Sequence, residues 1–118
     1  MRIFKFGGAS VKDADGIKNV YDVLQKAGYE DVLLVVSAMG KTTNALEVVI
    51  KNYFEKSAEL SASVQEIKKY HNQILLDLFE NDKDPVFAAV NEQFTDLEYF
   101  LAHNKSPNYN FVYDQIVS

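Results

Sequence analysis

A lysine and two glycines stand together near the start of the chain. Residues 2–6 form a short apolar and aromatic run that Lys5 interrupts, and Gly7 and Gly8 follow directly. Glycine has no Cβ, so its backbone N–H groups can approach an anion closely. A lysine inside an apolar strand is expected to be buried and to need an anionic partner. The pattern favours a phosphate at the end of this strand, and an edge-strand lysine that reaches solvent beside an ordinary turn is the alternative for this motif alone.

A second polar loop, residues 37–44, places hydroxyl groups, a lysine and a glycine ahead of an expected helix. Its Gly40-Lys41-Thr42 resembles the end of a P-loop, but that motif requires a glycine five positions before Gly40, where Val35 stands. The loop is therefore not a Walker A sequence. Its Ser, Thr and Asn residues also suit a plain helix N-terminus, so capping alone is the alternative.

A strand, a helix and a second strand are predicted to hold these two loops. Helical spacing is shared by four residues between the loops, Ile17, Val20, Tyr21 and Leu24. Asp13 can cap the start of this helix and Gly28 can close its end. The unbroken apolar run Val32–Val36 is typical of a parallel strand covered on both faces. Parallel strands place both loops at one sheet edge, where open α/β sheets bind ligands, so we expect a phosphate or carboxylate site there. The positive dipole end of the helix after Gly8 is expected to point at this site.

The chain after Thr42 is predicted to be helical. Several apolar stripes with helical spacing follow one another, and the last covers residues 109–116. Two capping-box spacings predict helix starts, Asn44 with Glu47 and Ser63 with Glu66. Asp84 followed by Pro85 predicts the start of a further helix, which should stop near residues 104–107.

Composition and charge exclude several classes of protein. The 118 residues include no cysteine, which excludes a disulfide framework and a thiolate zinc site and fits a reducing compartment. Seventeen acidic against 12 basic residues give a net charge of −5, so nucleic acid is not an expected partner. The start of the chain does not resemble a signal peptide, and no apolar run approaches the roughly 20 residues that span a bilayer. We expect a soluble, cytoplasmic protein without a membrane partner.

The remaining titratable residues predict no catalytic or metal site. His71 lies on an apolar stripe and His103 near a helix end, so packing or dipole roles are favoured over catalysis. The acidic residues Glu80, Asp82 and Asp84 could bind a divalent ion, but a calcium loop needs more ligands and a turn glycine. A solvated loop between helices is the favoured interpretation, and no metal ligand is predicted.

The two polar loops together resemble those of aspartate kinases, in the amino acid kinase superfamily. KFGGASV at residues 5–11 and VVSAMGKTTN at residues 35–44 carry the resemblance, which extends along the chain to the closing YDQIVS at residues 113–118. It implies an α/β fold, the N-terminal part of the amino acid kinase (carbamate kinase-like) fold, with a parallel βαβ unit followed by several helices. Residues 1–118 would then be an incomplete catalytic domain, inactive alone, without the rest of the kinase domain and the ACT domains.

The resemblance also implies an activity and a set of site residues. The activity is ATP- and Mg²⁺-dependent phosphorylation of the L-aspartate side chain to 4-phospho-L-aspartate, towards lysine, threonine and methionine, by a protein that is a homo-oligomer at full length. Lys5 matches the catalytic and phosphate-binding lysine. The other matched positions are Gly7, Gly8 and Ser10 for ATP phosphates, and Ser37, Ala38 and Thr43 for aspartate. Ala9 departs from the Thr or Ser that is common in the family.

Two alternatives to this function stay open. One is another amino acid kinase with a different acceptor, although the loop at residues 37–44 favours aspartate over the acceptors of the sister families. The other is a non-catalytic phosphate-binding or assembly module, which would keep the same loops without performing the reaction.

Overall fold

The chain forms two compact units, Met1–Thr42 and Thr43–Ser118. The computed structural model describes residues 1–28, 30–79 and 84–117 of these units. No helix in this described part is long and apolar enough to cross a membrane. Because each unit has its own secondary structure and its own buried residues, the two are described one after the other.

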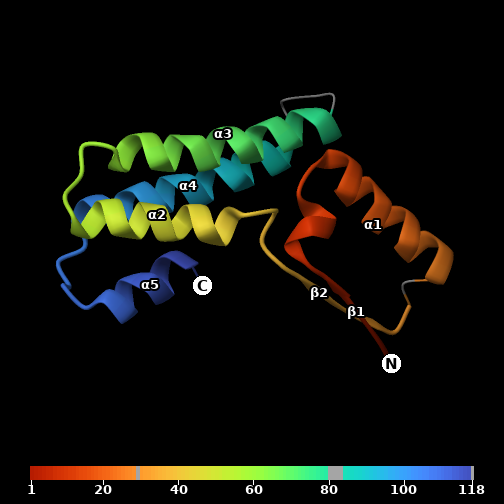
Figure 1. Cartoon of the computed structure of the whole chain (residues 1–118). Coiled ribbons are helices and arrows are strands. Elements are labelled where there is room, and N and C mark those ends of the chain that lie inside the picture. Colours follow the sequence, from red (N-terminus) through yellow and green to blue (C-terminus); the bar gives the residue numbers. More distant parts are fainter. Residues whose placement is uncertain (29, 80–83, 118) are drawn as a thin grey trace. The chain divides into compact units, whose positions relative to one another are not determined.

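The first unit is a parallel βαβ arrangement (Figure 1). Its elements are β1 (Arg2–Phe6), the short 3-10 helix η1 (Gly8–Val11), α1 (Ala14–Ala27) and β2 (Val32–Val36). The strands pair in register, with Arg2 opposite Val32 and Lys5 opposite Val35. Both predicted strands and the helix between them are confirmed with their predicted direction, so the carboxyl ends of β1 and β2 open on the same edge.

Helix α1 is capped at both ends by the predicted residues. The Asp13 carboxylate accepts a hydrogen bond from the Gly16 N–H at 2.8 Å, and Gly28 closes the helix with a φ of 80°. A contact that the sequence did not predict strengthens the C-terminal end. The Arg2 guanidinium donates to the carbonyls of Ala27 and Gly28 at 2.7 and 3.0 Å, which satisfies helix-end acceptors with a cation.

The two-stranded sheet is more open than predicted. Its second strand leaves four apolar side chains between 42% and 50% exposed, Leu33, Leu34, Val35 and Val36. The prediction of a strand covered on both faces is therefore wrong for this chain. The first unit contains a single long helix, and one helix can cover at most one face of a sheet.

The second unit is a helical bundle. Its elements are α2 (Thr42–Phe54), whose first residue closes the first unit, α3 (Leu60–Leu78), α4 (Pro85–His103) and α5 (Tyr109–Val117). Figure 1 shows α2, α3 and α4 side by side, and one buried cluster joins them through Val49, Val64, Ile67 and Phe94. Helix α5 joins the bundle through aromatic contacts, in which the ring of Phe54 lies 5.5 Å from that of Tyr109.

Of the helix caps predicted for the second unit, one is confirmed and two are wrong. Asp84 caps α4 as predicted, because its carboxylate accepts from the Val86 N–H at 3.0 Å. Both predicted capping boxes are wrong, since α2 already begins at Thr42 and α3 at Leu60. The Ser63 hydroxyl lies inside α3 and donates to the Leu60 carbonyl at 2.7 Å instead of capping.

Candidate phosphate-binding site

The carboxyl ends of β1 and β2 bring the two polar loops into contact. The Ser37 N–H donates to the Phe6 carbonyl at 3.0 Å and so extends the strand pairing by one residue. Beyond it, the Gly40 N–H donates to the Gly8 carbonyl at 3.0 Å. All four residues belong to the first unit. The predicted meeting of the loops at one sheet edge is thus confirmed.

The two glycines of the first loop have different surroundings. A Cβ placed on Gly8 would lie 2.6 Å from the Gly40 carbonyl oxygen and 3.0 Å from that of Ala38, both backbone atoms. A Cβ placed on Gly7 would meet no atom within 4 Å. Gly8 is therefore required by the packing of the second loop, whereas Gly7 leaves open space in which an anion can approach the backbone. The sequence assigned both residues the same role.

Lys5 lies on an exposed face of the sheet, which corrects the expectation that it is buried. Side chains alternate along a strand, so Lys5 shares a face with Ile3, whereas Arg2 extends from the other face to the end of α1. Among the described residues the Lys5 ammonium has no hydrogen bond or ion pair. Because the Lys5 ammonium is exposed to solvent, it does not need an anionic partner to offset a cost of burial. In the described part of the chain it remains a positive charge without a protein partner near the end of β1.

Ser37 extends the face of the sheet that carries this cation. Lys5 is paired with Val35, and Ser37 stands two residues further along, so strand alternation puts Ser37 on the Lys5 face. Both Ser37 and Ala38 are exposed. Thr43 is the first residue of the second unit and lies half-buried in the first turn of α2. The hydrogen bonds of the structure thus join the two predicted loops within the first unit.

The segment between Gly8 and α1 contains an element that was not predicted. A four-residue 3-10 helix follows the loop, and α1 begins at Ala14, directly after the predicted cap Asp13. The Asp13 carboxylate already accepts one N–H of the first turn of α1. Ser10 lies in the 3-10 helix and donates its N–H to the Gly7 carbonyl at 3.0 Å.

Gly16 is a structural residue that the sequence analysis missed. A Cβ on Gly16 would lie 2.5 Å from the carbonyl oxygen of Ser10, so the first turn of α1 packs directly on the 3-10 helix. A glycine at the third position of a helix is unfavourable by propensity alone. That local conflict is the signal that could have identified a close backbone contact.

The described residues contain a candidate anion site but no cluster of metal-binding side chains. Lys5 and the open backbone at Gly7 fit an anion. No group of three His, Asp or Glu side chains in the described part of the chain could hold a metal ion. Glu80 and Asp82 of the predicted acidic loop lie outside the described residues.

Both histidines have structural contacts within the second unit. The ring of His71 packs edge-on against that of Phe94 with 5.7 Å between centroids, and its Nδ1–H donates to the Ile67 carbonyl at 2.9 Å. His103 stacks on Tyr99 with 4.1 Å between centroids, near the end of α4. These contacts agree with packing roles for both rings.

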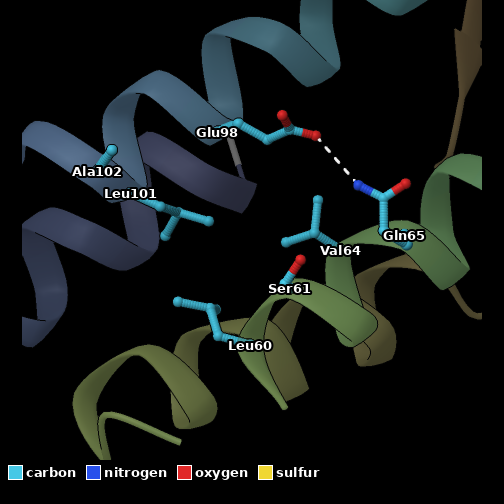
Figure 2. Close-up of a pocket in the computed structure, with 7 residues that line it drawn as sticks. All are labelled: Leu60, Ser61, Val64, Gln65, Glu98, Leu101 and Ala102. Carbon is cyan, nitrogen blue, oxygen red and sulfur yellow. Dashed lines mark hydrogen bonds between the residues drawn. The ribbon is translucent and has the colours of Figure 1, made fainter. Parts of the chain in front are cut away.

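An open groove of about 260 Å³ lies between α3 and α4 (Figure 2). It is lined by Leu60, Ser61, Val64, Gln65, Glu98, Leu101 and Ala102. Its polar side holds a long hydrogen bond of 3.4 Å from Gln65 Nε2 to Glu98 Oε1. The one hydroxyl in this lining, on Ser61, has no lysine or histidine beside it among the lining residues. The groove therefore has no set of groups for catalysis and contains none of the predicted site residues.

The fold defines a class, an α/β unit in which two polar loops meet at the carboxyl ends of parallel strands, where open α/β sheets bind ligands. Comparison with known proteins narrows this class. The chain is 29% identical over 100 residues, 84% of its length, to the bifunctional aspartokinase/homoserine dehydrogenase 1, chloroplastic, of Arabidopsis thaliana. It is 33% identical to aspartokinase 1, chloroplastic, of the same plant over 79 residues, which are 64% of this chain. It is 46% identical to aspartokinase 2, chloroplastic, also from this plant, over 44 residues, which are 37% of this chain.

These relatives confirm the resemblance to aspartokinases that the two motifs indicate. The aligned part corresponds to only 11%, 14% and 8% of the length of the three relatives. No family model matches the chain.

Proposed function

We propose that residues 1–118 form the N-terminal part of an aspartokinase catalytic domain with the amino acid kinase fold. In this proposal the complete protein transfers a phosphoryl group from ATP to the side-chain carboxylate of L-aspartate and so forms 4-phospho-L-aspartate for lysine, threonine and methionine synthesis. The observation that supports it best is the hydrogen bond from Gly40 to Gly8, which joins the two loops whose motifs resemble aspartokinases.

Lys5 has the central role in the proposed reaction. Phosphoryl transfer depends on positioning and on neutralising the charge of the transferring group, more than on covalent chemistry. An exposed ammonium without an internal partner can supply that charge, and the backbone N–H groups of Gly7 and Gly8 and the hydroxyl of Ser10 can orient phosphate oxygens. Ser37, Ala38 and Thr43 would hold the aspartate. Magnesium, when bound with the nucleotide, would neutralise further phosphate charge.

The open surroundings of these residues fit one wall of a larger site. Lys5, Gly7, Ser37 and Ala38 are all exposed. Phosphoryl transfer requires a site that excludes water and surrounds the reacting groups. We therefore propose that the 118 residues alone are inactive and that the active protein is a longer homo-oligomer.

For the compartment we propose the cytoplasm, as the composition suggests. The relatives reported above are named as chloroplastic, so the two possibilities can be separated by imaging a fluorescent fusion of the complete protein in its own cell.

The test is an assay of the complete protein, meaning the product of the whole reading frame that contains these residues. ADP release with ATP, magnesium and L-aspartate should exceed the release without acceptor by at least an order of magnitude. A protein that phosphorylates another acceptor but not aspartate would be a different amino acid kinase. A protein that binds ATP and turns over none of a panel of amino acid acceptors would be a binding module, and either result would overturn the proposal.

A further inference from the structure

We propose that Gly40 is a positioning residue, which holds the second loop against Gly8 and thereby keeps the Gly7 side of the first loop open for a phosphate. This inference rests on the proposed function. It assigns a task to a residue that the motif comparison left without one.

The contact between Gly40 and Gly8 is formed by backbone atoms on both sides. The Gly40 N–H donates to the Gly8 carbonyl at 3.0 Å. The Gly40 carbonyl oxygen would lie only 2.6 Å from a Cβ placed on Gly8. Gly40 has a φ of 53°, in the left-handed region that favours glycine. This conformation lets the loop present both its N–H and its carbonyl to the same neighbour.

The loop that follows is held in turn by the start of α2. Both the N–H and the hydroxyl of Thr42 donate to the Met39 carbonyl, at 3.0 and 2.5 Å. Thr42 is 9% exposed, so these bonds are shielded from water. Gly40 is therefore fixed on one side by Gly8 and on the other by a bonded turn, and its position does not depend on a flexible side chain.

In the proposed site the two neighbouring glycines, Gly7 and Gly8, have different roles. Gly8 is occupied by the contact with the second loop, and Gly7 is the residue with open space around it. An anion bound at Gly7 meets a backbone that has already been ordered, so the entropy of ordering is not lost on binding. If the contact between Gly40 and Gly8 is lost, the backbone of the first loop around Gly7 is no longer held in one orientation.

The experiment compares Gly40→Val with Gly40→Asn in the 118-residue chain. Valine disfavours a positive φ strongly because it is β-branched, whereas asparagine tolerates it, and both retain the N–H. ATP titration is followed through backbone amide NMR signals, with the signals of α3 and α4 as the measure of folding. We expect Gly40→Val to weaken ATP binding by about tenfold or more, and Gly40→Asn to stay within about threefold of the parent chain.

A second measurement separates this inference from the proposed function. Hydrogen exchange of the Gly40 amide in the parent chain should be slowed at least tenfold relative to an unstructured amide, whether or not ATP binds. Slowed exchange, together with a complete protein that neither binds ATP nor phosphorylates aspartate, would contradict the proposed function and leave the contact intact. Unprotected exchange, or equal ATP affinity in the valine and asparagine variants, would overturn the positioning role of Gly40.

Discussion

The two units of this chain are stabilised in different ways. The second unit buries an apolar cluster from three helices, in which Val49 is 0% and Phe94 8% exposed. Among the described residues of the first unit the buried apolar ones are Val11 and Ala14, and close contacts at Gly8 and Gly16 leave no room for a Cβ. The predicted phosphate ligands lie in this first unit. The structure of the two loops therefore depends on close contacts between backbone atoms, whereas the stability of the bundle depends on the volume of its buried side chains.

The largest expected effect is on the free energy of unfolding, and it tests how strongly the bundle depends on its buried side chains. Phe94→Ala removes a buried ring and leaves a cavity, which should lower the free energy of unfolding by about 3–5 kcal/mol. Tyr99→Ala on the same helix is the matched control, because Tyr99 is 66% exposed and its loss should cost less than about 1 kcal/mol. Urea unfolding followed by circular dichroism measures both, and equal losses would show that the cluster around Phe94 is not the core.

The next effect tests the cation in the first unit. In the complete protein, Lys5→Ala should lower kcat by on the order of 10² or more, because a preorganised charge on the transferring phosphoryl group is lost. Lys18→Ala, an exposed lysine on α1, is the control and should leave kcat unchanged. A loss below about threefold for Lys5→Ala would remove Lys5 from the mechanism.

A smaller effect separates two neighbouring threonines. Thr43→Val should raise the KM for aspartate by up to about tenfold, the effect of one lost hydrogen bond, and spare the KM for ATP. Thr42→Val removes the hydroxyl bonded to Met39, so it should lower thermal stability and change the KM for aspartate less. Equal changes in both KM values for Thr43→Val would contradict its assignment to the aspartate site.

The smallest effect concerns the attachment of α5. The Tyr113 hydroxyl donates to Glu47 Oε1 at 3.2 Å, and this hydrogen bond is the main cause of a raised pKa of Tyr113. A pKa raised by folding stabilises the protein below the unfolded value of 10.0, and the contribution is lost as the pH rises through the folded pKa. Thermal stability should therefore fall slightly more between pH 9 and pH 11 in the parent chain than in Tyr113→Phe. An identical pH dependence of the two proteins would show that this bond does not hold α5.

The order and type of the elements could be predicted from the sequence because periodic apolar residues determine them. The strands and their parallel direction followed from apolar patterns, and the Asp84 cap followed from the Asp-Pro pair. The sequence left the exposure of Lys5 open and wrongly predicted a covered β2, since exposure depends on what covers the sheet rather than on the strand itself. The predicted capping boxes at Asn44 and Ser63 failed because the helices extend further toward their N-termini than the motif spacing suggests.

The sequence predicted which loops form the candidate site, but it did not predict the separate role of each glycine. The motifs placed two loops at one edge, and the strand register brings them there. That Gly8 packs on Gly40 while Gly7 stays open depends on backbone positions a few ångströms apart, which no residue pattern records. The contact of Gly16 with Ser10 escaped prediction for the same reason.

The central claim is that the two loops of the first unit form one phosphate-binding surface, and amide NMR titration of the 118-residue chain with ATP tests it most directly. We expect weak binding, with a Kd of about 1 mM or above because only one wall of the site is present. The shifts should concentrate on Gly7, Gly8, Ser10, Ser37 and Ala38 and be lost in Lys5→Ala. Shifts confined to the helical bundle, or shifts at the loops that persist unchanged in Lys5→Ala, would contradict the account.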